Sequence, residues 1–71
     1  MSEKTEMMAD MVKNLAALLV EQNSGMTMEE ALATVFNSET YRKVVDERTH
    51  FYHQSYHYVF AFLKEELTKS S

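Results

Sequence analysis

Residues 5–23 decide the fold, and they read TEMMADMVKNLAALLVEQN. At about 100° of turn per residue, their apolar side chains cover an arc of roughly 220° around a helix. The arc consists of Met7, Met8, Met11, Val12, Leu15, Ala16, Leu18, Leu19 and Val20. A surface helix of a globular protein needs an apolar stripe of only about 100°. The sequence therefore predicts a central helix, which either its own chain or a second chain must cover.

The residues after this helix mark the start of a second one. Gly25, the only glycine, falls where a chain that leaves a helix takes a positive φ. The stretch TMEE at residues 27–30 fits a capping box, in which Thr27 caps the helix and the Glu30 side chain reaches back to the Thr27 amide. We expect a short helix over residues 28–36. Its apolar side chains are Ala31, Leu32, Val35 and Phe36.

Two further helices complete the expected fold. Asn37 or Ser38 caps the third helix, and Ser55 caps the last, which runs over residues 56–67 with one apolar stripe. The side chains of the third helix that are predicted to face inward are Tyr41, Val44 and Val45. The sequence thus predicts an all-α chain, a compact bundle of about four short helices with the first helix longest and central.

The composition bounds the domain organisation and excludes several functions. Seventy-one residues make a single helical domain over residues 1–71, with ends expected to fray at about 1–4 and 68–71. The absence of Cys excludes disulfides, and the net charge of −4 disfavours nucleic acids and anionic membranes. The longest apolar run, residues 15–20, is far shorter than the roughly 20 residues that span a bilayer. We therefore expect a cytoplasmic protein with no cofactor and no membrane partner.

Three histidines, His50, His53 and His57, form the best candidate site for chemistry. On an unbroken helix they share a stripe of roughly 60° with Asp46. His53 and His57, at positions i and i+4, have the spacing of a helical histidine pair that chelates a divalent metal ion. His50 lies about 10 Å of helix rise from His57, so the three do not converge on one ion. If Ser55 starts a new helix, the stripe is broken and the histidines belong to a solvated aromatic surface.

A helix-turn-helix over residues 28–48 is an alternative interpretation. The two short helices have about the right lengths, and the second carries Arg42, Lys43 and Arg48. Glu39 stands at the start of the supposed recognition helix, where phosphates or base edges should lie, so simple packing of two helices is favoured. The chain has no Gly-rich phosphate loop and is too small for an obvious enclosed pocket. We expect no catalytic activity.

Two segments in the second half of the chain carry a family resemblance. Residues 38–41 read SETY, and residues 51–59 read FYHQSYHYV. They resemble a class of small uncharacterised bacterial proteins that share an S-x-T-Y segment and an L-Y-x-Q-S-x-x-Y-V stretch before a final helix. Phe51 stands where this pattern has Leu, and the histidines lie outside the pattern. The resemblance, over residues 27–67, implies a compact all-helical bacterial domain of unknown function without an assigned active-site residue.

Two aromatic side chains of the last helix point to association. Tyr58 and Phe62 lie outside its apolar stripe, four residues apart and so at contact spacing. A chain this short leaves much apolar area uncovered, and association is one way to bury it. We expect a non-catalytic interaction protein that forms a homodimer through the first helix and this aromatic pair, with another protein as the alternative partner. The predicted interface residues are Met8, Met11, Leu15, Leu18, Tyr58 and Phe62.

Overall fold

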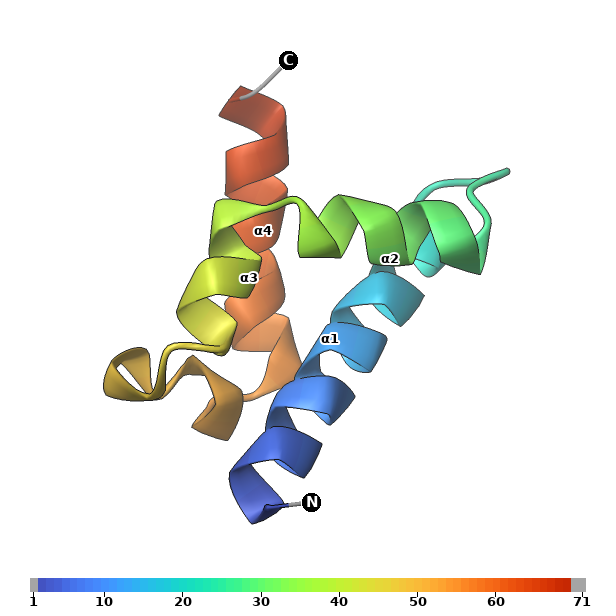
Figure 1. Cartoon of the computed structure of the whole chain (residues 1–71). Helices are drawn as coiled ribbons and strands as arrows, with labels where there is room; N and C mark the ends of the chain where they lie inside the picture. The colour runs from blue at the N-terminus through green and yellow to red at the C-terminus, as the bar shows by residue number, and fades with distance from the viewer. Residues whose placement is uncertain (1, 70–71) are drawn as a thin grey trace.

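The computed structural model describes residues 2–69. It contains four α-helices, which are α1 Glu3–Gln22, α2 Met28–Phe36, α3 Glu39–Val44 and α4 Tyr56–Lys69. Two single-turn 3₁₀ helices, η1 Glu47–Thr49 and η2 Phe51–His53, connect α3 to α4. The described part of the chain is therefore all-α with α1 as its longest helix, as the sequence predicts. Figure 1 shows α2 crossing the C-terminal half of α1, and α3 beside α4.

The helices extend further toward the chain ends than the sequence predicts. The Ser2 side chain accepts a hydrogen bond from the Thr5 amide at 3.2 Å, so α1 is capped and begins at Glu3. At the other end, α4 continues to Lys69, beyond its predicted end at residue 67. The remaining positions that were expected to fray, residues 1, 70 and 71, lie outside the described residues.

The turn and cap between α1 and α2 form as expected from the sequence. Gly25 has a φ of 91°, which confirms the predicted positive φ. Thr27 Oγ1 accepts a hydrogen bond from the Glu30 amide at 3.1 Å, and Glu30 Oε1 accepts one from the Thr27 amide at 2.9 Å. These bonds satisfy amides that the start of a helix otherwise leaves unpaired. The capping box therefore fixes where α2 begins.

Serine side chains cap both helices of the second half. Ser38 Oγ accepts a hydrogen bond from the Tyr41 amide at 3.0 Å, and Ser55 Oγ accepts one from the Tyr58 amide at 3.2 Å. Ser38 is thus the cap among the two candidates, and Ser55 begins a new helix. The segment between these helices consequently lies outside any α-helix.

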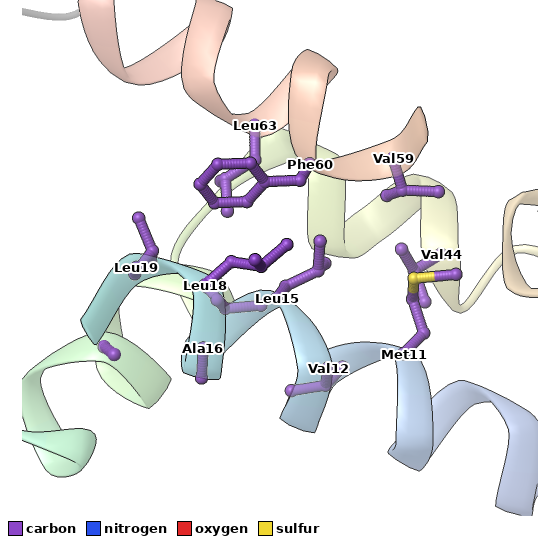
Figure 2. Close-up of a cluster of buried hydrophobic side chains, with 12 residues drawn as sticks. Met11, Val12, Leu15, Ala16, Leu18, Leu19, Val44, Val59, Phe60 and Leu63 are labelled. Atoms are coloured by element: carbon purple, nitrogen blue, oxygen red, sulfur yellow. The ribbon is translucent and has the colours of Figure 1, made fainter. Parts of the chain in front are cut away.

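The core lies between α1 and the three other α-helices. Its buried apolar side chains are Met11, Val12, Leu15, Ala16, Leu18, Leu19, Ala31, Val35, Val44, Val59, Phe60 and Leu63. Figure 2 shows Leu15 of α1 on the side of Phe60 and Leu63 of α4, and Met11 close to Val44 of α3. Full burial of such a side chain stabilises the fold by roughly 1.5–3 kcal/mol. Helix α1 is therefore central, and its own chain covers the greater part of its apolar arc.

Within residues 2–69, no helix combines the length and the apolar character that crossing a bilayer requires. Helix α1 has the length, but Glu6, Asp10 and Lys13 interrupt its apolar sequence.

Candidate protein-binding surfaces

Three of the interface residues predicted on α1 lie in the core of the same chain. Leu15 is 0% exposed, and Met11 and Leu18 are buried beside it. Helices α2, α3 and α4 make the contacts with α1 that a second chain was expected to make. The prediction that these three side chains form an interface is wrong, because closely packed side chains of the same chain already fill the space around them.

The remaining part of the apolar arc opens onto a groove, which we call the α1–α2 groove. The groove has a volume of about 370 Å³ and runs between α1, the end of α2, and α3. Its walls are formed by Thr5, Met8, Ala9, Val12, Lys13, Leu32, Phe36, Tyr41 and Val45. Met8, the fourth interface residue predicted on α1, is half-buried here. The five residues from α1 recur at i, i+3, i+4, i+7 and i+8, the spacing of one helix face.

Aromatic and branched side chains form the outer wall of the groove. Phe36, the last residue of α2, is 51% exposed, and its ring meets the Tyr41 ring edge-to-face with 5.1 Å between centroids. Val45 is also exposed, so its predicted inward position is wrong. Successive helical residues point about 100° apart, and because Val44 fills the core, Val45 faces outward. This outward turn places Val45 on the groove wall.

Charges are unevenly distributed along the groove. Lys13 is the one lining residue with a charged side chain, and in the described part of the chain no carboxylate pairs with it. A second depression adjoins the groove, and its charges are paired: Lys4 with Glu47 at 3.3 Å, and Arg48 with Asp46 at 2.9 Å. Hydrogen bonds from Arg48 lower the pKa of Asp46, which keeps this pair ionised. The groove itself therefore carries one uncompensated positive charge.

Tyr58 and Phe62 form a second exposed apolar surface, which we call the aromatic ridge. Tyr58 is 51% exposed and Phe62 is 37% exposed, so both lie outside the core as the sequence predicts. Their ring centroids are 5.3 Å apart, and Phe51 supports Phe62 from η2 at 5.1 Å. Lys43 Nζ lies 5.9 Å from the Phe62 ring centroid, a cation–π contact. The predicted role of these rings at an interface remains a prediction.

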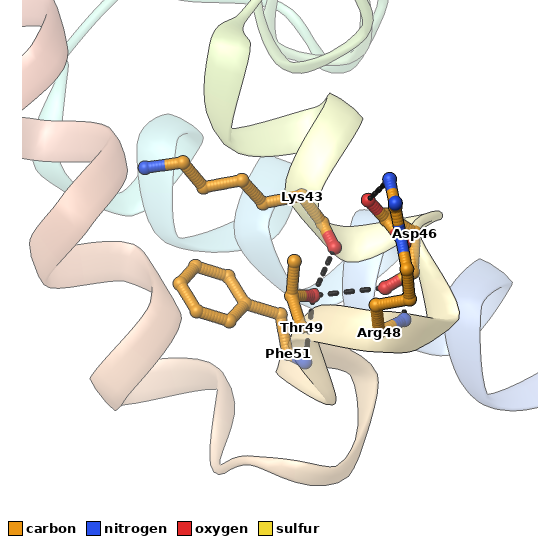
Figure 3. A network of polar contacts seen from close by, with 5 residues as sticks. All are labelled: Lys43, Asp46, Arg48, Thr49 and Phe51. Carbon is orange, nitrogen blue, oxygen red and sulfur yellow. Dashed lines mark hydrogen bonds and ion pairs between the residues drawn. The ribbon is translucent and has the colours of Figure 1, made fainter.

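The segment between α3 and α4 sets the position of Phe51. Figure 3 shows the Thr49 hydroxyl between the carbonyl oxygens of Lys43 and Asp46. The same hydroxyl oxygen accepts a hydrogen bond from the Phe51 amide at 3.2 Å. His50 takes a φ of 57°, in the left-handed region, and turns the chain from η1 into η2. These contacts hold Phe51 against the ridge.

The structure places the three histidines in different turns, with the His50 and His53 rings near each other at 6.1 Å between centroids and His57 beyond Ser55. His50 lies between η1 and η2, His53 ends η2, and His57 lies in the first turn of α4. The unbroken helix that the chelating His53–His57 pair requires does not form, because Ser55 caps a new helix between them. The His53 ring packs beside Tyr52 with centroids 4.4 Å apart. Within residues 2–69, no three His, Asp or Glu side chains gather in a way that could hold a metal ion.

A carboxylate from α4 occupies the N-terminus of α3. Glu66 accepts hydrogen bonds from the Glu39 amide at 2.8 Å, from the Thr40 amide at 2.9 Å and from the Thr40 hydroxyl at 2.8 Å. Burial raises the pKa of Glu66, but these hydrogen bonds and the charge of Lys43 outweigh burial, so the pKa is lowered. The N-terminus of a recognition helix contacts DNA in a helix-turn-helix protein, and here it contacts Glu66 instead. Sequence reasoning missed this contact, since nothing local links Glu66 to α3.

No protein-family model, curated protein or solved structure significantly matches this chain. The residues of the bacterial pattern have structural roles in the fold. Ser38 and Ser55 cap α3 and α4, Thr40 binds Glu66, and Val59 is fully buried. The resemblance remains an expectation that rests on these two segments of sequence.

Proposed function

We propose that this chain is a small, non-catalytic interaction protein whose α1–α2 groove binds apolar side chains of a protein partner. The observation that carries the proposal is the groove itself, about 370 Å³ of open space with mostly apolar walls. Release of water from this apolar surface would favour binding.

The shape of the groove favours a protein partner over a small molecule. Small-molecule pockets enclose most of the surface of their ligands, whereas this groove is open to solvent along one side. Open apolar grooves of this kind receive the apolar face of a helix. Phe36 on the rim is an aromatic residue of the type found at the centres of protein interfaces.

The charges disfavour the helix-turn-helix alternative. The chain carries a net charge of −4. Of the three basic residues on which DNA binding would depend, Arg42 pairs with Glu39 at 3.5 Å and Arg48 pairs with Asp46. Phosphate affinity depends on basic groups, and the carboxylates of Glu39 and Asp46 beside these two arginines repel phosphates. An apolar partner therefore fits this surface better than a nucleic acid.

A titration with helical peptides tests the proposed function. The peptides carry Leu, Met or Phe at positions i, i+4 and i+7 and are uncharged elsewhere, and binding is followed through backbone amide chemical shifts. We expect the largest shifts at Met8, Leu32, Phe36 and Val45. Peptides that shift no groove residue would contradict the proposal.

Two variants provide a matched comparison in the same titration. Phe36 and Tyr58 are both 51% exposed, but only Phe36 lines the groove. Phe36→Ser should weaken peptide binding about tenfold or more, as loss of a central aromatic contact does. Tyr58→Ser, which leaves the groove of its own molecule intact, should not weaken peptide binding. Equal losses in the two variants would show that the groove is not the binding surface.

A further inference from the structure

The groove and the aromatic ridge have complementary dimensions. Along α1, the groove extends from Thr5 to Lys13, a helix rise of about 12 Å. On α4, Tyr58, Phe62 and Glu65 stand at i, i+4 and i+7 on one helix face, a rise of about 10.5 Å. A helix that binds in a groove presents its side chains at this spacing. The ridge of one molecule thus has the length that the groove of another can hold.

The two surfaces offer one pair of opposite charges, Lys13 and Glu65, while Lys43 lies 5.9 Å from the Phe62 ring within the ridge. The groove has one uncompensated cation, Lys13, at its end. The ridge continues from its two rings to the carboxylate of Glu65. Glu65 pairs with Lys69 in its own helix at 2.9 Å, but both side chains are well exposed, and such a pair contributes little stability. If Glu65 gives up its ion pair with Lys69 and pairs with Lys13 of another molecule, the loss of the first pair therefore costs little free energy.

From these two observations we propose that the occupant of the groove is the aromatic ridge of a second copy of this chain. Tyr58 and Phe62 enter the apolar length of the groove beside Phe36, and Glu65 pairs with Lys13. This inference rests on the proposed function, because it names the partner of the same groove. It differs from the expected symmetric homodimer, in which α1 of one chain would contact α1 of the other.

A contact between two different surfaces is heterologous unless two copies exchange it reciprocally, which closes a symmetric pair. In the head-to-tail arrangement, each added molecule leaves a groove free at one end of the assembly and a ridge free at the other, and the chain forms an open series or a closed ring. Aromatic rings from both sides meet in the contact, an arrangement that contributes beyond the burial of area alone.

Mixing two variants tests the head-to-tail contact. Phe36→Ser removes the groove wall and Tyr58→Ser removes the ridge, and circular dichroism first confirms that each variant is folded. In native mass spectrometry, the unaltered chain should form dimers and larger species as its concentration rises. Each variant alone should be a monomer, and their equimolar mixture should form a dimer and nothing larger.

Two results of this experiment would overturn the inference. If Phe36→Ser or Tyr58→Ser alone still forms dimers, the contact is symmetric and uses one surface twice. If the unaltered chain remains a monomer at every concentration while helical peptides bind the groove, the partner is another protein and the proposed function stands. Failure of the peptides to bind the groove would instead remove the proposed function itself.

A charge exchange tests the pairing of Lys13 with Glu65. Lys13→Glu should weaken assembly about fivefold, since it places two carboxylates together. Adding Glu65→Lys in the same chain should restore the assembly. Lys64→Glu, which points about 100° away from Glu65 on α4, is the control that makes the same change in net charge outside the contact. An unrestored double variant, or an equal loss in the control, would contradict the pairing.

Discussion

Helix α1 carries two apolar faces of similar composition and opposite surroundings. One face, which includes Leu15 and Leu18, is closed by α2, α3 and α4. The other, which includes Met8 and Ala9, opens onto the α1–α2 groove. The width of an apolar arc therefore reports how much apolar area a helix has to cover. It does not report whether the same chain covers it.

The largest expected effect comes from the closed face. Leu15→Ala should lower the free energy of unfolding by about 2–5 kcal/mol, because Leu15 is fully buried and the substitution leaves a cavity in a packed core. Urea unfolding followed by far-UV circular dichroism measures the change. A loss below about 1 kcal/mol would mean that this face is not closed.

An intermediate loss of stability is expected at the contact between Glu66 of α4 and the start of α3. Glu66→Gln should lower the free energy of unfolding by about 1 kcal/mol at pH 7, because it weakens the hydrogen bonds to the Glu39 and Thr40 amides. The pKa of Glu66 is lowered in the fold, so the carboxylate stabilises the fold fully above the pKa that Glu66 has in the unfolded chain. This contribution is lost as the pH falls through the folded pKa.

The pH dependence of stability distinguishes the loss of these hydrogen bonds from other effects of Glu66→Gln on the fold. Urea unfolding at pH 7 and at about pH 3 should show a difference between the unaltered chain and the variant that shrinks at the lower pH. The comparison between the two proteins cancels the titration of the other carboxylates. A difference that stays constant, or grows, would contradict the role of the ionised Glu66 carboxylate.

The smallest effect is expected on the open face. Val45→Thr keeps the shape of an exposed side chain on the groove wall and should change the free energy of unfolding by less than about 0.5 kcal/mol. The same urea experiment gives the value. A loss comparable to that of Leu15→Ala would show that the groove is part of the core, and the contrast between the two faces of α1 would fail.

Local signals in the sequence predicted most of the fold. The capping box of Thr27 and Glu30 marked the start of α2, and Ser55 marked the start of α4. These signals work because a cap involves residues two or three positions apart. The turns around His50 were not predictable in the same way, since a single left-handed residue and two short 3₁₀ turns have no periodicity.

The candidate site was only partly predictable. Tyr58 and Phe62 stood out because their positions depend on the face of one helix. The groove depends on how α2 and α3 cross α1, and the cap of α3 by Glu66 joins residues 26 and 27 positions apart. Neither arrangement can be predicted from a stretch of neighbouring residues in the sequence. Exposure of one helix face can therefore be predicted from sequence, whereas a surface built from three helices requires the structure.

A single chain closes the Leu15 face of α1 without help from a second copy. Far-UV circular dichroism on a dilution series tests it most directly, continued until native mass spectrometry finds only the single chain of 8.3 kDa. We predict that the helical signal and cooperative urea unfolding persist at that dilution, although assembly through the groove is lost. Loss of the helical signal as the chains separate would contradict the account, because it would show that another copy completes the core.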